Sequence, residues 1–218
     1  MSARGMRRPG EGGFAMRTKG ALLALAIALA GICGCSVPKT EYYQLKAPNE
    51  MNSAAAAGDA LPITLLVGPL KASHLYREDR LVYSTDSDEM GTYQNHRWAQ
   101  APTAMIQELL WRSLRASGHY SSVYQLSSSS HGDFLLQGNL YDFKEVSGNA
   151  VVARMSVDLD LRDMKSGAIV WTHAYDHDEP VSRKTVPAVV AALDQNAQEF
   201  VSDAESSLSQ YFAAHPNR

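Results

Sequence analysis

Hydrophobic and polar residues alternate strictly between Val151 and Arg162. Successive side chains of a strand point to opposite faces, so this pattern predicts a strand with one buried face, as in antiparallel sheets. Strand-like segments precede it at 134–146 and follow it at 168–175, and turn-forming residues at 147–149 and 165–167 separate the three. The sequence therefore predicts a three-stranded β-meander.

Two amphipathic helices are predicted at 101–117 and 187–212, where apolar residues recur at three- and four-residue steps. A buried strand at 62–70 is expected to end at Gly68-Pro69, because proline cannot donate to the ladder. Shorter β-prone runs lie at 40–45, 80–84, 91–98 and 120–126. We expect an α+β fold: a single-domain α/β sandwich, its mostly antiparallel sheet carrying both helices on one face.

The N-terminal residues form a second pattern, typical of a lipoprotein signal. Arg17 and Lys19 precede an almost unbroken Ala/Leu/Ile run at 21–32, which has the length of a signal peptide and is short for a membrane span. Ile32-Cys33-Gly34-Cys35 then matches a lipobox. Cys35 is favoured for lipidation because it follows the small Gly34, whereas the alternative, Cys33, follows the large Ile32.

This signal predicts three segments: a signal peptide at 1–34, the lipidated cysteine with a short tether at 35–41, and a folded domain at 42–218. Met16 is an alternative start, because the signal is complete from that residue. Ser36, which is not acidic, favours the outer membrane over the inner membrane.

The composition of the body narrows the class of function. The chain has 20 Lys+Arg and 23 Asp+Glu, of which residues 1–34 hold five and one, so the body carries a net charge of −7. An acidic body without a basic cluster argues against nucleic acid as a partner and against electrostatic docking on anionic lipid. The body contains no cysteine beyond Cys35, which excludes disulfides and thiolate metal sites there.

The best candidate for chemistry is the run T-H-A-Y-D-H-D-E-P at 172–180. Its possible metal ligands are His173, Asp176, His177, Asp178 and Glu179. On a strand, the two histidines share a face but lie about 13 Å apart, too far for one metal ion unless the chain turns between them. We therefore interpret the run as an acidic strand end entering a loop. The sequence predicts no catalytic residue, no cofactor and no metal, and hence no enzyme.

The order of several segments resembles a known family. These segments are Y-Y-Q-L at 42–45, P-I-T-L-L-V-G-P-L at 62–70, R-L-V-Y-S-T-D at 80–86 and N-H-R-W-A-Q-A-P at 95–102. Together with the meander and the closing helix, they resemble the auxiliary lipoproteins of ABC-type transport systems (PqiC-like lipoproteins) from Tyr42 onward.

The resemblance implies a periplasm-facing lipoprotein that works with an MCE-domain protein and an ABC transporter or related inner-membrane components. Such systems move lipids or other hydrophobic molecules between the inner and outer membranes, and the expected role is docking or assembly. The alternative is a periplasmic lipid-binding carrier with an apolar cavity between helices and sheet. A homo-oligomer is compatible with either role.

Five residues are the candidates for function. Cys35 is the lipidation site. The candidates for partner contact are Tyr83, Tyr93, Arg97 and Trp98. Trp98 has core packing as its alternative, because Trp and Tyr at strand positions more often pack inside.

Overall fold

The computed structural model describes residues 39–46, 60–85, 89–127, 129 and 131–216. Both lipobox cysteines lie outside these residues. The residues from Thr40 onward belong to one compact unit. Its elements are β1 (Glu41–Tyr43), β2 (Leu61–Ala72), the 3₁₀ turn η2 (His74–Tyr76), β3 (Arg80–Thr85), β4 (Met90–Trp98), α2 (Pro102–Ala116), β5 (Tyr120–Gln125), β6 (Phe134–Ser147), β7 (Val151–Asp163), β8 (Ile169–Pro180) and α3 (Val186–Ala214).

Strand β6 is the centre of the sheet. One side of β6 pairs antiparallel with β7, which pairs antiparallel with β8, so the predicted meander is confirmed. The other side pairs in parallel with β2 along its first half and with β3 along its second half. Strands β2 and β3 therefore follow one another along the same edge of β6. The sheet continues from β2 to β5 in parallel, and from β3 to β4 antiparallel and on to β1 in parallel.

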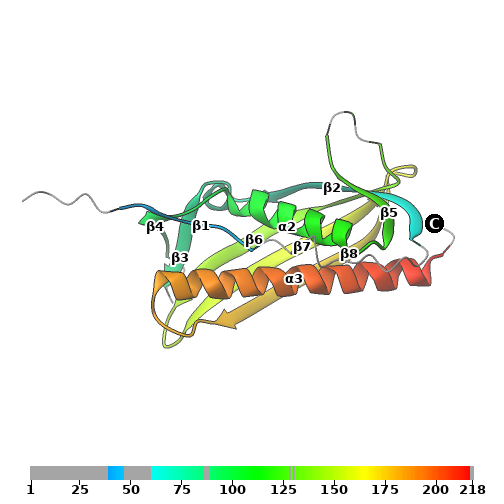
Figure 1. Cartoon of the computed structure of the whole chain (residues 1–218). Helices are drawn as coiled ribbons and strands as arrows, with labels where there is room; N and C mark the ends of the chain where they lie inside the picture. The colour runs from blue at the N-terminus through cyan, green and yellow to red at the C-terminus, as the bar shows by residue number, and fades with distance from the viewer. Residues whose placement is uncertain (1–38, 47–59, 86–88, 128, 130, 217–218) are drawn as a thin grey trace, which may run out of the picture. The chain divides into compact units, whose positions relative to one another are not determined.

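Both helices pack on one face of this sheet, as predicted (Figure 1). Helix α2 contacts β2 and β5, and α3 contacts β7 and β8. The alternate side chains of β7 from Ala153 to Leu161 are almost fully buried, as their alternation predicted. They join one apolar cluster with Ile106 of α2 and Phe200 of α3. The fold is therefore α+β, with its longest strand pairings antiparallel.

Two boundaries differ from the prediction. Strand β2 passes through Gly68-Pro69 and ends at Ala72, because the pairing with β6 shifts register between Val67 and Leu70. Pro69 falls in this irregular part of the ladder, where its missing N–H is tolerated. Strand β8 extends to Pro180 rather than ending in a loop, because β7 offers it pairing partners as far as Val152.

The short strand β1 belongs to the folded unit. It pairs with β4, the Ala99 N–H donates to the Tyr43 carbonyl at 2.6 Å, and Leu45 is 6% exposed. Strands β1, β3 and β4 lie together at one end of the sheet, and β5 lies at the other (Figure 1). Neither helix in the described part of the chain has the length and apolar character needed to cross a bilayer.

Candidate functional site

Four aromatic rings gather at the end of the sheet formed by β1, β3 and β4. Tyr83 meets Tyr93 edge-on with ring centres 5.1 Å apart, and Tyr93 meets His96 edge-on at 5.8 Å. Tyr43 stacks on His96 at 5.9 Å. These separations are those of favourable aromatic pairs. We call Tyr43, Tyr83, Tyr93 and His96 the aromatic end cluster; all four are partly exposed.

Carboxylates accept hydrogen bonds from two tyrosine hydroxyls of this cluster, those of Tyr93 and Tyr43. The Tyr93 hydroxyl donates to Glu145 Oε2 at 2.6 Å, and Glu145 is only 7% exposed. Burial and then this hydrogen bond raise the pKa of Tyr93. The Tyr43 hydroxyl donates to Glu41 Oε2 at 2.6 Å, and burial followed by this bond raises the pKa of Tyr43 to about 12. Both phenols therefore stay protonated at neutral pH. The Tyr93–Glu145 pair lines a cavity of about 200 Å³ beside the first turn of α3.

The structure brings together only part of the predicted contact set. Tyr83 and Tyr93 touch, and Arg97 follows on β4, where its Nη1 lies 2.7 Å from Asp79 Oδ1. Trp98 is 1% exposed and packs on Phe143 with ring centres 5.4 Å apart. Trp98 thus occupies the core, which was its alternative placement, and its ring is not displayed at the surface.

Sequence reasoning did not single out three members of this site, Tyr43, His96 and Glu145. A signal existed for the first two, because Tyr43 lies in Y-Y-Q-L and His96 in N-H-R-W-A-Q-A-P. Glu145 gave none. Its burial depends on β6 being covered at that point by neighbouring elements distant in sequence.

A second polar site follows the contact between β8 and α3. Two steps along a strand cover about 6.6 Å and one helical turn about 5.4 Å, so alternate β8 residues can reach successive turns of α3. Trp171 and His173 meet successive turns, at Ser207 and Asp203, whereas Tyr175 and His177 both meet the turn that holds Asn196 and Glu199. The resulting pairs, which we call the β8–α3 ladder, are Trp171 with Ser207, His173 with Asp203, Tyr175 with Asn196 and His177 with Glu199.

The ladder separates the candidate ligands of the run at 172–180. His173 Nε2 lies 2.8 Å from Asp203 Oδ2, whereas His177 Nε2 lies 3.4 Å from Glu179 Oε2. The two histidines therefore do not converge on one point, because the chain between them is a continuous strand.

The residues between the ladder positions take part in other pairs. Asp178 accepts two hydrogen bonds from the Arg154 guanidinium, each 2.7 Å long. These bonds lower the pKa of Asp178, although burial opposes the shift. Asp178 is thereby tied to the neighbouring strand β7 rather than to α3.

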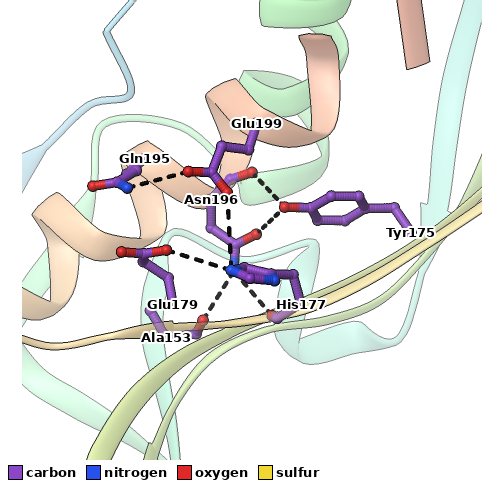
Figure 2. A network of polar contacts seen from close by, with 7 residues as sticks. All are labelled: Ala153, Tyr175, His177, Glu179, Gln195, Asn196 and Glu199. Carbon is purple, nitrogen blue, oxygen red and sulfur yellow. Dashed lines mark hydrogen bonds and ion pairs between the residues drawn. The ribbon is translucent and has the colours of Figure 1, made fainter. Parts of the chain in front are cut away.

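Asn196 is the buried centre of the ladder (Figure 2). Its side chain is fully buried, and its Nδ2 donates to the Ala153 carbonyl at 2.9 Å and to the His177 carbonyl at 3.0 Å. Its Oδ1 accepts from the Tyr175 hydroxyl at 2.7 Å. Burial, and then the charges of nearby carboxylates, raise the pKa of Tyr175, so this hydroxyl remains a donor. Asn196 thus joins α3 to β7 and β8 at once.

Sequence reasoning singled out neither Asn196 nor Glu199 of α3. Asn196 had a detectable signal, because it lies three residues after Leu193 and four before Phe200, on the apolar stripe. Glu199 had none, since only the docking of α3 brings it to His177.

The chain is similar to known proteins in its sequence and in its fold. The model of the family "ABC-type transport auxiliary lipoprotein component" matches residues 43–204. The crystal structure of a Xanthomonas campestris protein from family DUF330 superposes with a TM-score of 0.65 at 20% identity, covering 75% of this chain and 92% of that one. A second crystal structure, of an uncharacterized protein, gives 0.59 at 18% identity, with coverages of 78% and 99%.

These structural likenesses concern the fold alone. The PelC dodecamer from Paraburkholderia phytofirmans has a TM-score of 0.42 at 16% identity, with coverages of 67% and 93%, and supports no inference about assembly. No curated protein matches the chain.

Proposed function

Because this chain belongs to the family of ABC-type transport auxiliary lipoprotein components, we propose that it is a membrane-anchored docking partner in the periplasm. Its partners would be an MCE-domain protein and an ABC transporter or related inner-membrane components. The assembled system would move lipids or other hydrophobic molecules between the two membranes. We place the anchor at Cys35 and in the outer membrane.

The observation that carries this proposal is the position of β1. Glu41, its first residue, is six residues after Cys35, and β1 is hydrogen-bonded into the sheet beside β4. Six residues of chain reach at most about 20 Å when fully extended. A domain held so close to its anchor cannot cross the periplasm, so a transport partner must come to it.

The same geometry selects the contact surface. The aromatic end cluster includes Tyr43 of β1 itself, two residues after the tether ends at Glu41. Partly exposed tyrosines are well suited to interfaces, because they offer apolar area and a polar group with few rotatable bonds. We propose Tyr83, Tyr93 and Arg97 as contact residues. Trp98 would act indirectly, by supporting β4 from the core.

The core favours docking over the alternative carrier role. A carrier needs space for an acyl chain between helices and sheet. The inward side chains there, among them Ile106, Leu136 and Phe200, are each fully buried in one cluster. The space that a carrier would use between these elements is filled by side chains.

The anchoring step is tested with Cys35→Ala and its matched control Cys33→Ala. We expect Cys35→Ala to abolish palmitate labelling and to release the protein from the membrane fraction, whereas Cys33→Ala keeps both. Retention of label and membrane association in Cys35→Ala would refute the assignment.

The docking step is tested by capture from detergent-solubilised envelope, with identification of the bound proteins. We expect an MCE-domain protein with the unaltered chain and markedly less with Tyr83→Ala or Arg97→Ala. Tyr124→Ala is the matched control, because Tyr124 is 54% exposed on β5 at the other end of the sheet. If Tyr83→Ala and Arg97→Ala capture as much MCE protein as the control Tyr124→Ala does, the aromatic end cluster is not part of the interface. Repeated failure to recover any MCE protein would refute the partnership.

A further inference from the structure

Three potential metal ligands converge between β8 and α3. His177 and Glu179 lie two residues apart on β8 and therefore on the same face of that strand, and Glu199 comes from α3. His177 Nε2 lies 3.4 Å from Glu179 Oε2 and 3.8 Å from Glu199 Oε2. One donor atom from each residue lies within 4.8 Å of the other two. Figure 2 shows both carboxylates directed at the imidazole.

We propose that His177, Glu179 and Glu199 bind a divalent transition-metal ion, for which Zn²⁺ is the best match. Zinc bound at about 2.0–2.2 Å in tetrahedral geometry separates its ligand atoms by about 3.3–3.6 Å. The separations of 3.4 and 3.8 Å from His177 Nε2 are already close to this range, so only small side-chain movements are needed. One imidazole and two carboxylates form a set that suits zinc, whereas magnesium and calcium prefer oxygen ligands alone.

The charge of the cluster favours a cation. Two carboxylates face one histidine, which leaves a net charge of −1 even if the imidazole is protonated. The nearby guanidinium of Arg154 is held by Asp178 through two hydrogen bonds. A divalent ion bound to neutral His177 would balance both carboxylates.

The surroundings hold two of the ligands in place. Gln195 Nε2 donates to Glu199 Oε1 at 3.1 Å, which leaves Oε2 directed at His177. Asn196 holds the His177 carbonyl and is itself fully buried. Partners of this kind orient metal ligands and strengthen binding. The side chains of His177 and Glu199 are 43% and 47% exposed, so an ion can enter and a water molecule can fill the fourth position.

The ion would cross-link β8, the last strand of the meander, to the helix that covers it. This role is separate from docking at the aromatic end cluster, so failure of either proposal leaves the other unchanged. The prediction that the sequence holds no metal site rested on His173 and His177. The new site replaces His173 with Glu199, which lies 22 residues beyond His177 in the chain.

Titration of the metal-free, untagged protein with Zn²⁺ tests this proposal, by calorimetry and by competition with a chromogenic chelator. We expect saturable binding of one ion per chain and a higher Tm in the presence of Zn²⁺. His177→Ala and Glu199→Gln should abolish both effects while leaving the metal-free Tm and circular dichroism unchanged. Gln195→Ala should weaken binding by about 10- to 100-fold, as expected for a residue that orients a ligand.

His173→Ala is the matched control, because His173 is the next histidine on the same face of β8 and pairs with Asp203. It should bind zinc as the unaltered protein does. Absence of saturable binding would overturn the proposal. So would binding that His177→Ala and Glu199→Gln retain, or binding that His173→Ala alone removes.

Discussion

Replacement of Asn196 tests whether one buried amide fixes α3 on the sheet. Asn196→Ala removes two donated hydrogen bonds, to the carbonyls of Ala153 and His177, and one accepted from Tyr175. A buried polar group left without a partner costs about 1–3 kcal/mol. The Tyr175 hydroxyl keeps a longer contact of 3.3 Å to the Asn196 carbonyl, so the two strand carbonyls carry most of the effect. We expect the free energy of unfolding to fall by about 2–4 kcal/mol.

Asn196→Asp separates the role of the amide from that of its volume. An ionised carboxylate of the same shape cannot donate, and it would face two carbonyl oxygens in the buried site. The folded-state pKa of that carboxyl should therefore lie above its unfolded value of about 3.9. A raised pKa means that the folded state holds the proton more tightly, so the variant loses stability as pH rises from about 4 toward 7. The protonated acid can still donate to one carbonyl.

Urea unfolding followed by circular dichroism at several pH values measures both effects. Asn149→Asp is the matched control, because Asn149 is exposed in the turn between β6 and β7. It should change stability little at any pH. The reasoning is refuted if the two Asn→Asp variants show the same pH dependence, or if Asn196→Ala costs less than about 0.5 kcal/mol, the size of an ordinary surface change.

Two further predictions concern the sheet. A Cβ at Gly138 would lie 2.0 Å from the Asp158 carbonyl oxygen, so Gly138→Ala should lower the free energy of unfolding by about 1–3 kcal/mol or more. Gly68→Ala, which meets the flexible Leu135 side chain at 3.2 Å, should cost less in the same urea assay, and equal losses would contradict this account. Arg154→Gln should cost below about 1 kcal/mol at pH 7, because its pair with Asp178 is over one-third exposed. The pKa of Asp178 is lowered in the folded state, so the stability that the ion pair contributes is present above the unfolded pKa and is lost as pH falls through the folded pKa. The free energies of unfolding of variant and parent should therefore converge in acid. A difference between them that widens in acid would contradict the assignment.

The sequence predicted the elements whose signal is local. The alternation from Val151 to Arg162 identified β7 and its buried face, because side-chain direction along a strand depends only on position in that strand. Helix α2 begins with Pro102 in its first turn and is followed by Gly118 at φ 67°, and both residue types are locally favoured at these positions. The family was likewise recognisable from short segments in order.

The pairing of distant strands gave no such signal. Nothing in β2 or β3 predicts that both align in parallel along one side of β6, because pairing depends on which surfaces the whole chain leaves to be covered. The continuation of β2 through Pro69 and of β8 to Pro180 has the same origin. Strand β2 continues because β6 pairs with it and the register is irregular at Pro69, and β8 continues because β7 pairs with it.

The candidate sites show the same division. The sequence by itself determined which residue types were available: the lipobox cysteine, the tyrosines of β3 and β4, and the histidine and carboxylates of β8. Only the tertiary structure decided their surroundings. It buried Trp98 against Phe143 and placed Glu199 of α3 beside His177. The physical reason is that hydrophobic periodicity indicates only which face of a helix or strand is buried. Which other element packs on that face depends on the packing of the complete chain.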